Sequence, residues 1–160
     1  MPKPYRRPTH HRTGRPPQRD RRPEPPHAED HDAIRDLWEL LLPDPPPRGT
    51  QQLGFLPCEQ GQPLPKVLVI VDDVPADPPA QEVAEMCDGI AHVGAHLDDG
   101  GVLLAIVRHG SADVTEADVR WLEPLAAACR ERGVALLGLW LRVVGRPPLR
   151  LDAPRGVAVA

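Results

Sequence analysis

The segment VRHGSADVTEADVRWLEPL, residues 107–125, holds a histidine, a serine, a threonine and two aspartates between an apolar run and a helical pattern. Imidazole and carboxylate groups at such a position can bind a metal ion or activate a nucleophile. The same residues are typical of a helix start, where Thr115 caps the first turn and Asp118 completes a capping box. A carboxylate in the first turn also interacts favourably with the helix dipole. The helix start is therefore the simpler interpretation of both residues.

Two further polar pairs could form sites. Asp72 and Asp73 follow an apolar run and could bind Mg²⁺ or act as acid and base. Neighbouring strand residues point to opposite faces, however, and no glycine-rich phosphate loop follows them, so a solvated turn is favoured. His92 and His96 have the four-residue spacing of zinc-binding helices. Their segment HVGAH lacks the catalytic glutamate and contains Gly94, which favours two exposed histidines near a helix end.

The elements that would position these residues alternate along the chain. Apolar runs predict strands over residues 66–74, 102–107 and 134–144, with a short fourth over 148–151, and the run 66–74 predicts burial on both faces. Helical spacing predicts helices over residues 32–42, 80–97 and 114–132, the first capped by Asp30 or Asp32. Pro124 should kink or split the third helix. Residues 48–65 are predicted to be a loop with at most a short edge strand.

This alternation predicts the α/β fold class, with a mainly parallel or mixed central sheet flanked by helices. Ligands collect beyond the carboxyl ends of parallel strands, where Asp72, Asp73, His109, Ser111 and Asp113 are expected.

The first residues differ sharply in composition from the rest. Residues 1–31 contain eight prolines and few aliphatic side chains, which predicts a disordered arm over 1–29, one domain over 30–152 and a tail over 153–160. Residues 1–22 carry eight basic groups and one aspartate, a net +7, so the chain total of −4 leaves −11 elsewhere. The arm could bind nucleic acid nonspecifically or serve as a solubilising extension. The arginines concerned are Arg6, Arg7, Arg12, Arg15, Arg19, Arg21 and Arg22.

Several classes of protein are disfavoured by composition. No run approaches the roughly 20 apolar residues that span a bilayer, and no apolar stretch follows the amino terminus as in a secretory signal. An arginine-rich, acid-poor start is also found in organelle transit peptides. The dispersed Cys58, Cys87 and Cys129 favour a reducing, cytoplasmic location, and the residue usage suggests a bacterial source.

Cysteine and tryptophan positions give further expectations. Cys87 and Cys129 fall on apolar helix faces and are predicted to be core residues, whereas Cys58 falls in the predicted loop and should be more exposed. Trp38 and Trp140 are expected in the core, and Trp121 at an interface.

The stretch VLLAIVRHGSADVTEADVRWLEPLAAACRERGVALLGLWLRV resembles the C-terminal half of the RadC-like branch of the JAB/MPN (JAMM) metalloprotease superfamily. His109 matches the second histidine of the family's HxH, Thr115 and Asp118 match its Ser-x-x-Asp, and residues 133–137 match the following strand. The resemblance covers about residues 66–151. Val107 stands at the first histidine position, HG replaces HP, and the loop is two residues shorter. Since valine offers no lone pair, the resemblance implies a degenerate, metal-free member.

These observations favour a non-catalytic α/β protein that acts in interaction or regulation, with an unidentified protein partner and no cofactor. One alternative is a metal-dependent hydrolase that uses His109 and Asp118 with His92 or His96 as the missing ligand. Another is a nucleic-acid accessory protein that binds through its basic arm.

Overall fold

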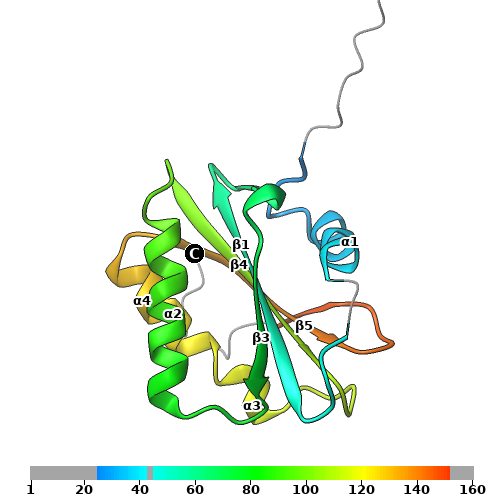
Figure 1. The fold of residues 1–160 in the computed structure, drawn as a ribbon. Coiled ribbons are helices and arrows are strands. Elements are labelled where there is room, and N and C mark those ends of the chain that lie inside the picture. Colours follow the sequence, from blue (N-terminus) through cyan, green and yellow to red (C-terminus); the bar gives the residue numbers. More distant parts are fainter. Residues whose placement is uncertain (1–24, 43–44, 152–160) are drawn as a thin grey trace, which may run out of the picture.

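The computed structural model describes residues 25–42 and 45–151, which form a mixed sheet with helices on both faces (Figure 1). The helices are α1 (His31–Leu41), α2 (Ala80–Gly94), α3 (Glu116–Val119) and α4 (Leu122–Glu131), with a 3₁₀ turn over Pro65–Val67. The strands are β1 (Thr50–Glu59), β2 (Gln62–Pro63), β3 (Val69–Pro75), β4 (Gly100–Arg108), β5 (Ala135–Val143) and β6 (Leu149–Leu151). The predicted α/β class is confirmed.

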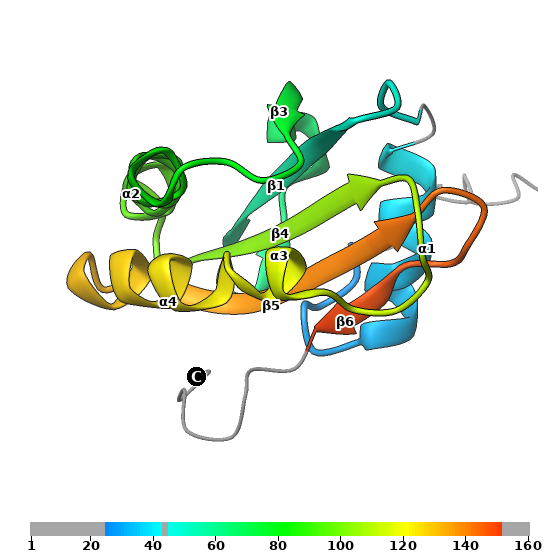
Figure 2. The same ribbon diagram turned by 90° about the horizontal axis from the view of Figure 1, so that it is seen from below.

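The sheet has the order β2-β1-β4-β5-β6, and β3 pairs with β1 beside β2. Of the strand pairs, β4 and β5 are parallel, whereas β1 is antiparallel to β2, β3 and β4, and β6 is antiparallel to β5. The sheet is thus mixed, and β3 and β6 lie at opposite edges (Figure 2). No helix of the described residues is long and apolar enough to cross a membrane.

The prediction of a loop over residues 48–65 is wrong, because β1 is a central strand whose residues 51–58 are buried. Gly54 and Pro57 interrupt the apolar pattern of β1, and contacts with other elements explain why each is tolerated. A Cβ on Gly54 would lie 3.0 Å from the Leu42 side chain, so the glycine lets α1 approach the sheet. The carbonyl of Pro57 accepts a hydrogen bond from the Leu64 amide at 2.9 Å, on the side away from β4. Its missing N–H therefore costs no bond to β4.

The prediction that residues 66–74 form a strand buried on both faces is also wrong. Lys66 and Val67 belong to the 3₁₀ turn, and β3 is an edge strand with Val69, Ile70 and Val71 exposed. A run of β-branched residues favours a strand, but whether the strand is central or at the edge depends on pairing elsewhere in the chain.

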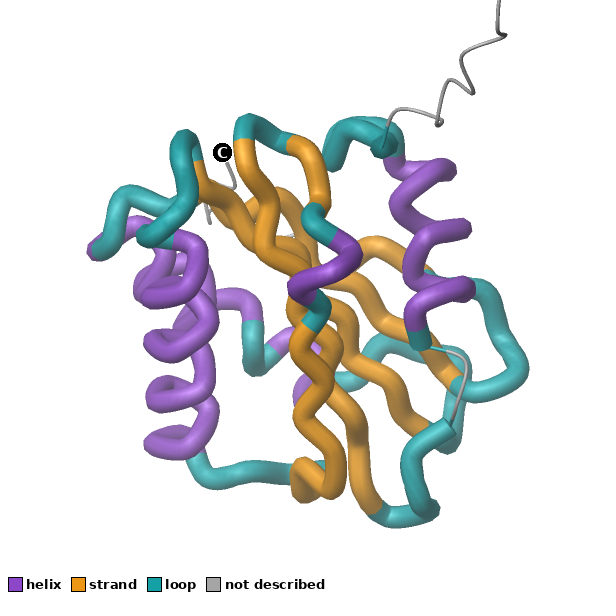
Figure 3. Tube along the Cα trace, turned by 45° about the horizontal axis from the view of Figure 1, so that its top comes forward, coloured by secondary structure: helices purple, strands orange, loops and turns teal. Residues whose placement is uncertain are grey.

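Each face of the sheet has its own core, and α1 lies on the opposite side from α2 (Figure 3). In β4, Leu104 and Ile106 belong to the core under α2 and α4, whereas Leu103, Ala105 and Val107 belong to the core under α1. This alternation is the period of two expected for a strand between two layers.

The cysteines and tryptophans fill these cores. Cys87 and Cys129 are buried as predicted, and so are Trp38 and Trp140. Cys58 is fully buried in β1, so its predicted exposure is wrong. Trp121 is also fully buried, against the expectation that it lines an interface.

The helix predictions are largely confirmed. The side chain of Asp30 caps α1 by accepting from the Ala33 amide at 3.1 Å. The third predicted helix is divided into α3 and α4, with Pro124 in the first turn of α4, where a missing N–H costs nothing. Residues 1–24 lie outside the described part. Ala28, assigned to the arm by composition, is buried, and its amide donates to the Gly61 carbonyl at 2.8 Å.

Candidate functional site

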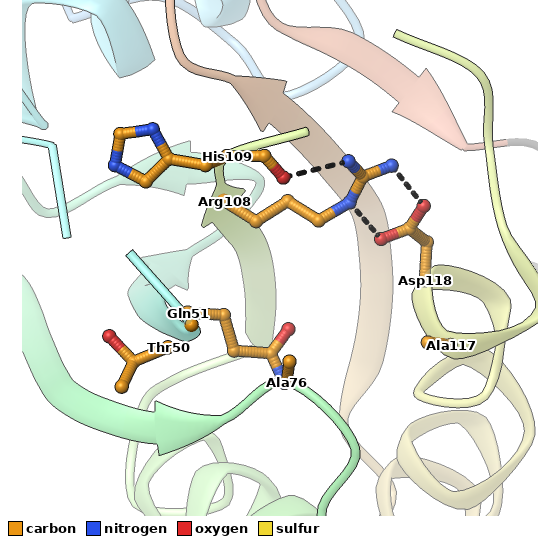
Figure 4. A pocket seen from close by; sticks show the side chains of 8 residues that line it. Thr50, Gln51, Ala76, Arg108, His109, Ala117 and Asp118 are labelled. Atoms are coloured by element: carbon orange, nitrogen blue, oxygen red, sulfur yellow. Dashed lines mark hydrogen bonds and ion pairs between the residues drawn. The ribbon is translucent and has the colours of Figure 1, made fainter. Parts of the chain in front are cut away.

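The end of β4, the loop after it and the start of α3 bring Arg108 and Asp118 together (Figure 4). Arg108 is the last residue of β4 and has the same strand parity as Leu104 and Ile106, which face α2 and α4. Its side chain is therefore directed to the face of the sheet on which α3 begins.

Arg108 and Asp118 form a bidentate ion pair. Arg108 Nε donates to Asp118 Oδ1 and Nη2 donates to Oδ2, both at 2.7 Å. The side chains are 14% and 1% exposed, so the pair is shielded from solvent. The planar fork of the guanidinium matches the two carboxylate oxygens, which gives the strongest form of charge-assisted hydrogen bond.

The remaining donors of Arg108 hold the loop that follows β4. Nη2 donates to the Asp113 carbonyl at 2.9 Å, and Nη1 donates to the carbonyls of Ser111 at 2.8 Å and His109 at 3.3 Å. The Arg108 side chain thus supplies the hydrogen bonds that these three carbonyls would otherwise need from water. The loop is organised around Arg108.

Asp118 also closes the first turn of α3. Its Oδ2 accepts from the amide of Thr115 at 2.8 Å and from the Thr115 hydroxyl at 3.0 Å, while Thr115 Oγ1 accepts from the Asp118 amide at 3.3 Å. These bonds form the capping box that the spacing predicts.

The electrostatics of Asp118 favour the charged carboxylate. Burial opposes the charge, but hydrogen bonds from Arg108 and Thr115 outweigh it and hold the pKa of Asp118 below its usual value. The hydrogen bond to Asp118 in turn raises the pKa of Arg108. Both groups are therefore charged, and each gives the other two of its hydrogen bonds.

His109 faces away from this pair (Figure 4). Its Nε2–H donates to the Pro46 carbonyl at 2.7 Å, which ties the β4 end to the loop after α1. Val107 has the same parity as His109 and packs in the α1 core. Val107, at the first histidine position of the family's HxH, thus lies on the α1 face, and the imidazole of His109 is turned to Pro46, while Asp118 pairs with Arg108. The structure does not bring His109 and Asp118 together as ligands.

His92 and His96 lie at the far end of β4 from His109. They are close to each other, with ring centroids 4.6 Å apart, and His96 Nδ1 contacts the His92 carbonyl at 2.8 Å. Both are near the carboxyl end of α2, which precedes β4, whereas His109 follows it. A nine-residue strand spans about 26–30 Å, so these histidines cannot complete a site with His109. Within residues 25–42 and 45–151, no group of three His, Cys, Asp or Glu side chains could hold a metal.

Asp72 and Asp73 lie inside β3, so the expectation of a solvated turn at these residues is wrong, although both side chains are exposed. Asp72 Oδ1 accepts from Gln52 Nε2 at 2.7 Å, and Asp73 has φ +56° at a bulge opposite Gln52. Ser111 donates its hydroxyl to Asp113 Oδ2 at 3.0 Å inside the loop that Arg108 holds.

A small cavity lies beside the ion pair, with a volume of about 90 Å³. Its lining comes from the start of β1, the turn after β3, the end of β4 and α3. The residues are Gly49, Thr50, Gln51, Ala76, Arg108, His109, Ala117 and Asp118.

Sequence reasoning missed Arg108, the central residue of the site. Its only sequence signal is strand parity, which sets Arg108 on the face opposite to His109. The arginines of the arm, from Arg6 to Arg22, lie outside the described residues. Comparison with family models, with curated proteins and with solved structures found no match.

Proposed function

We propose that this chain is a non-catalytic α/β domain that acts in interaction or regulation, in which an internal arginine has taken the place of a metal ion. The observation that carries the proposal is the pairing of both Asp118 oxygens with Arg108 at 2.7 Å. Asp118 is the residue that matches the aspartate ligand of the RadC-like domains that the sequence resembles. Here a fixed positive charge already neutralises it.

Metal binding at Asp118 would require breaking this pair. Removing one partner from a buried ion pair costs about 3–5 kcal/mol, because the other charge is left unpaired. Arg108 would also have to release three loop carbonyls or carry them with it. Val107 offers no lone pair in return, and the imidazole of His109 is bound to Pro46. The energetic balance therefore favours the ion pair.

The candidate nucleophiles support the same proposal. Burial raises the pKa of Cys58 and Cys87 to about 12 and that of Cys129 to about 11, so none of the three thiols is activated. Ser111 donates its hydroxyl to the exposed Asp113 carboxylate rather than to a histidine. The three cysteines are free, which fits action in the reducing environment of the cytoplasm.

Metal content of the purified full chain tests this proposal. We expect less than about a tenth of an equivalent of zinc, both as purified and after incubation with zinc followed by desalting. The Val107→His variant, which restores a histidine at the first HxH position, is the matched control. We expect it to bind as little zinc as the wild type, because residue 107 faces α1. Stoichiometric zinc that disappears in Asp118→Asn would overturn the proposal.

A further inference from the structure

The outer edge of β3 is unpaired within the described residues. β3 pairs with β1 on one side, and no described strand or helix covers the other (Figures 1 and 2). Val69, Ile70 and Val71 are 38%, 41% and 36% exposed, an unusual cluster of β-branched side chains for a solvated edge. Edge strands normally carry charges, prolines or bulges that prevent pairing with another chain. In β3 these features begin only at Asp72.

The backbone groups that face outward can be assigned from β1. The Pro57 carbonyl bonds to Leu64 on the side of β1 away from β4. Hydrogen-bonding direction alternates along a strand, so Phe55 and Leu53 also direct their N–H and C=O groups to that side. They pair with Val69 and Val71, respectively. Ile70, between these two, therefore directs its N–H and C=O to the free edge.

The side chains at this edge are apolar on both faces. Val69 and Val71 lie opposite Phe55 and Leu53, which face α2, whereas Ile70 lies opposite Gly54 on the α1 face. On the α2 face a groove of about 220 Å³ lies between β3 and α2. Its lining is almost wholly apolar and consists of Leu53, Phe55, Val71, Met86, Gly89 and Ile90. An occupant of the edge would thus gain both backbone bonds and apolar contacts.

We propose that a second copy of this chain pairs antiparallel with β3 across a two-fold axis at Ile70. A closed dimer of this kind uses the same patch on both copies, so the patch must be complementary to itself. With Ile70 at the axis, the two Ile70 residues exchange N–H···O=C bonds, and the Leu68 carbonyl meets the Asp72 amide of the other copy. Val69 of each copy then lies opposite Val71 of the other.

The charges at the ends of the strand favour this arrangement. Lys66 lies in the 3₁₀ turn before β3, and Asp72 and Asp73 lie toward the end of the strand; all three are exposed. Antiparallel pairing brings the lysine end of one copy to the aspartate end of the other. Centring the axis on Asp72 would instead set two carboxylates directly opposite each other, which is unfavourable. Centring it on Leu68 would require the 3₁₀ turn over Pro65–Val67 to unwind. Ile70 is the remaining outward-facing position. An axis at the non-hydrogen-bonded position Val71 would set Ile70 and Val69 opposite Asp72 and Asp73, and an axis at Val69 would again require the turn to unwind.

This inference does not depend on the proposed function, and sedimentation equilibrium of the full chain tests it. We expect a monomer–dimer equilibrium and a dissociation constant raised by about 100-fold or more in Ile70→Lys, since two ammonium groups then meet at the axis. Leu149→Lys is the matched control, because Leu149 is 51% exposed on β6, the opposite edge strand. It should leave the equilibrium unchanged. Circular dichroism establishes that both variants are folded.

Cysteine cross-linking tests the register separately from the stability of the variants. Directly opposite residues have Cβ atoms about 4.5–5.5 Å apart, close enough for a disulfide after modest adjustment. Ile70→Cys should therefore form a covalent dimer with oxidised glutathione, and a mixture of Val69→Cys and Val71→Cys should do the same. Either of these two alone should react far more slowly, and the native cysteines are buried. A monomer at all concentrations, a dimer insensitive to Ile70→Lys, a dimer lost on removal of residues 1–24, or equally fast cross-linking of Val69→Cys alone would each overturn the proposal.

Discussion

Replacing Arg108 by methionine removes the guanidinium and keeps most of the side-chain length. Asp118 is 1% exposed, and its carboxylate would retain only the hydrogen bonds from the Thr115 amide and hydroxyl. Breaking a buried pair typically costs 3–5 kcal/mol, and because Arg108 is slightly exposed we expect the lower end, about 3 kcal/mol. The loss is measured as the change in free energy of unfolding from urea denaturation at pH 7.

Arg132→Met is the matched control. Arg132 binds Asp88 with a similar bidentate geometry, at 2.6, 2.8 and 3.0 Å, but these side chains are 33% and 55% exposed. Exposed pairs of this kind contribute about 0–1 kcal/mol. The two arginine variants therefore separate the effect of burial from that of ion-pair geometry.

The cost of Arg108→Met should also depend on pH. Because the folded-state pKa of Asp118 is depressed, the pair stabilises the fold above the ordinary aspartate pKa of about 4, and this stabilisation is lost as the pH falls through the depressed value. Without Arg108, burial favours the neutral acid, so the variant relieves its unpaired charge by protonation. The difference between wild type and variant should thus shrink in acid. A cost no larger than that of Arg132→Met, or one that is the same at pH 7 and in acid, would refute the reasoning.

Three further predictions follow from packing, burial and charge. Gly54→Ala should lower the free energy of unfolding by about 1–3 kcal/mol, because the added Cβ would meet Leu42 at 3.0 Å. Gly89→Ala, which has open space around it in α2, should raise the free energy of unfolding by up to about 1 kcal/mol. Urea denaturation measures both changes, and changes of the same sign in the two variants would contradict the prediction. Cys58, Cys87 and Cys129 should react with a thiol reagent at pH 8 only as the chain unfolds, since burial raises their pKa values to about 11–12; rapid labelling of the folded chain would contradict the burial. If the arm binds nucleic acid, fluorescence titration should show affinity that falls steeply with salt and is lost when residues 1–22 are removed, and unchanged affinity of the shortened chain would exclude this role.

Local patterns in the sequence were sufficient to predict the helices and the capping box at which α3 begins. The capping box of Thr115 and Asp118, the cap at Asp30 and the division of the third helix at Pro124 all depend on neighbours within a few residues. Such signals act through backbone hydrogen bonds that can be counted along the chain.

The sheet required information from distant residues. β1 was missed because Gly54 and Pro57 interrupt its apolar pattern. Both residues are explained by contacts with other parts of the chain: Gly54 packs against Leu42, and the Pro57 carbonyl accepts from Leu64. β3 and β4 are both rich in β-branched and aliphatic residues, yet β4 is central and β3 is at the edge. Composition reports that a segment favours a strand, whereas its burial depends on which strands pair beside it.

The role of Arg108 could not be predicted for the same reason. Strand parity separates Arg108 from His109, but the face to which α3 returns is determined by the packing of α3 and α4. The family resemblance therefore implied that His109 and Asp118 act together, whereas in the structure His109 binds the Pro46 carbonyl and Asp118 binds Arg108.

The most direct test of the central claim is the ¹³C chemical shift of the Asp118 carboxyl carbon, followed through a pH titration with and without one equivalent of zinc. If Arg108 holds the carboxylate, the pKa of Asp118 lies below its usual value, zinc leaves the titration curve unchanged, and Arg108→Met raises the pKa. A zinc-dependent shift of this carbon, or an ordinary pKa that does not respond to Arg108→Met, would contradict the account.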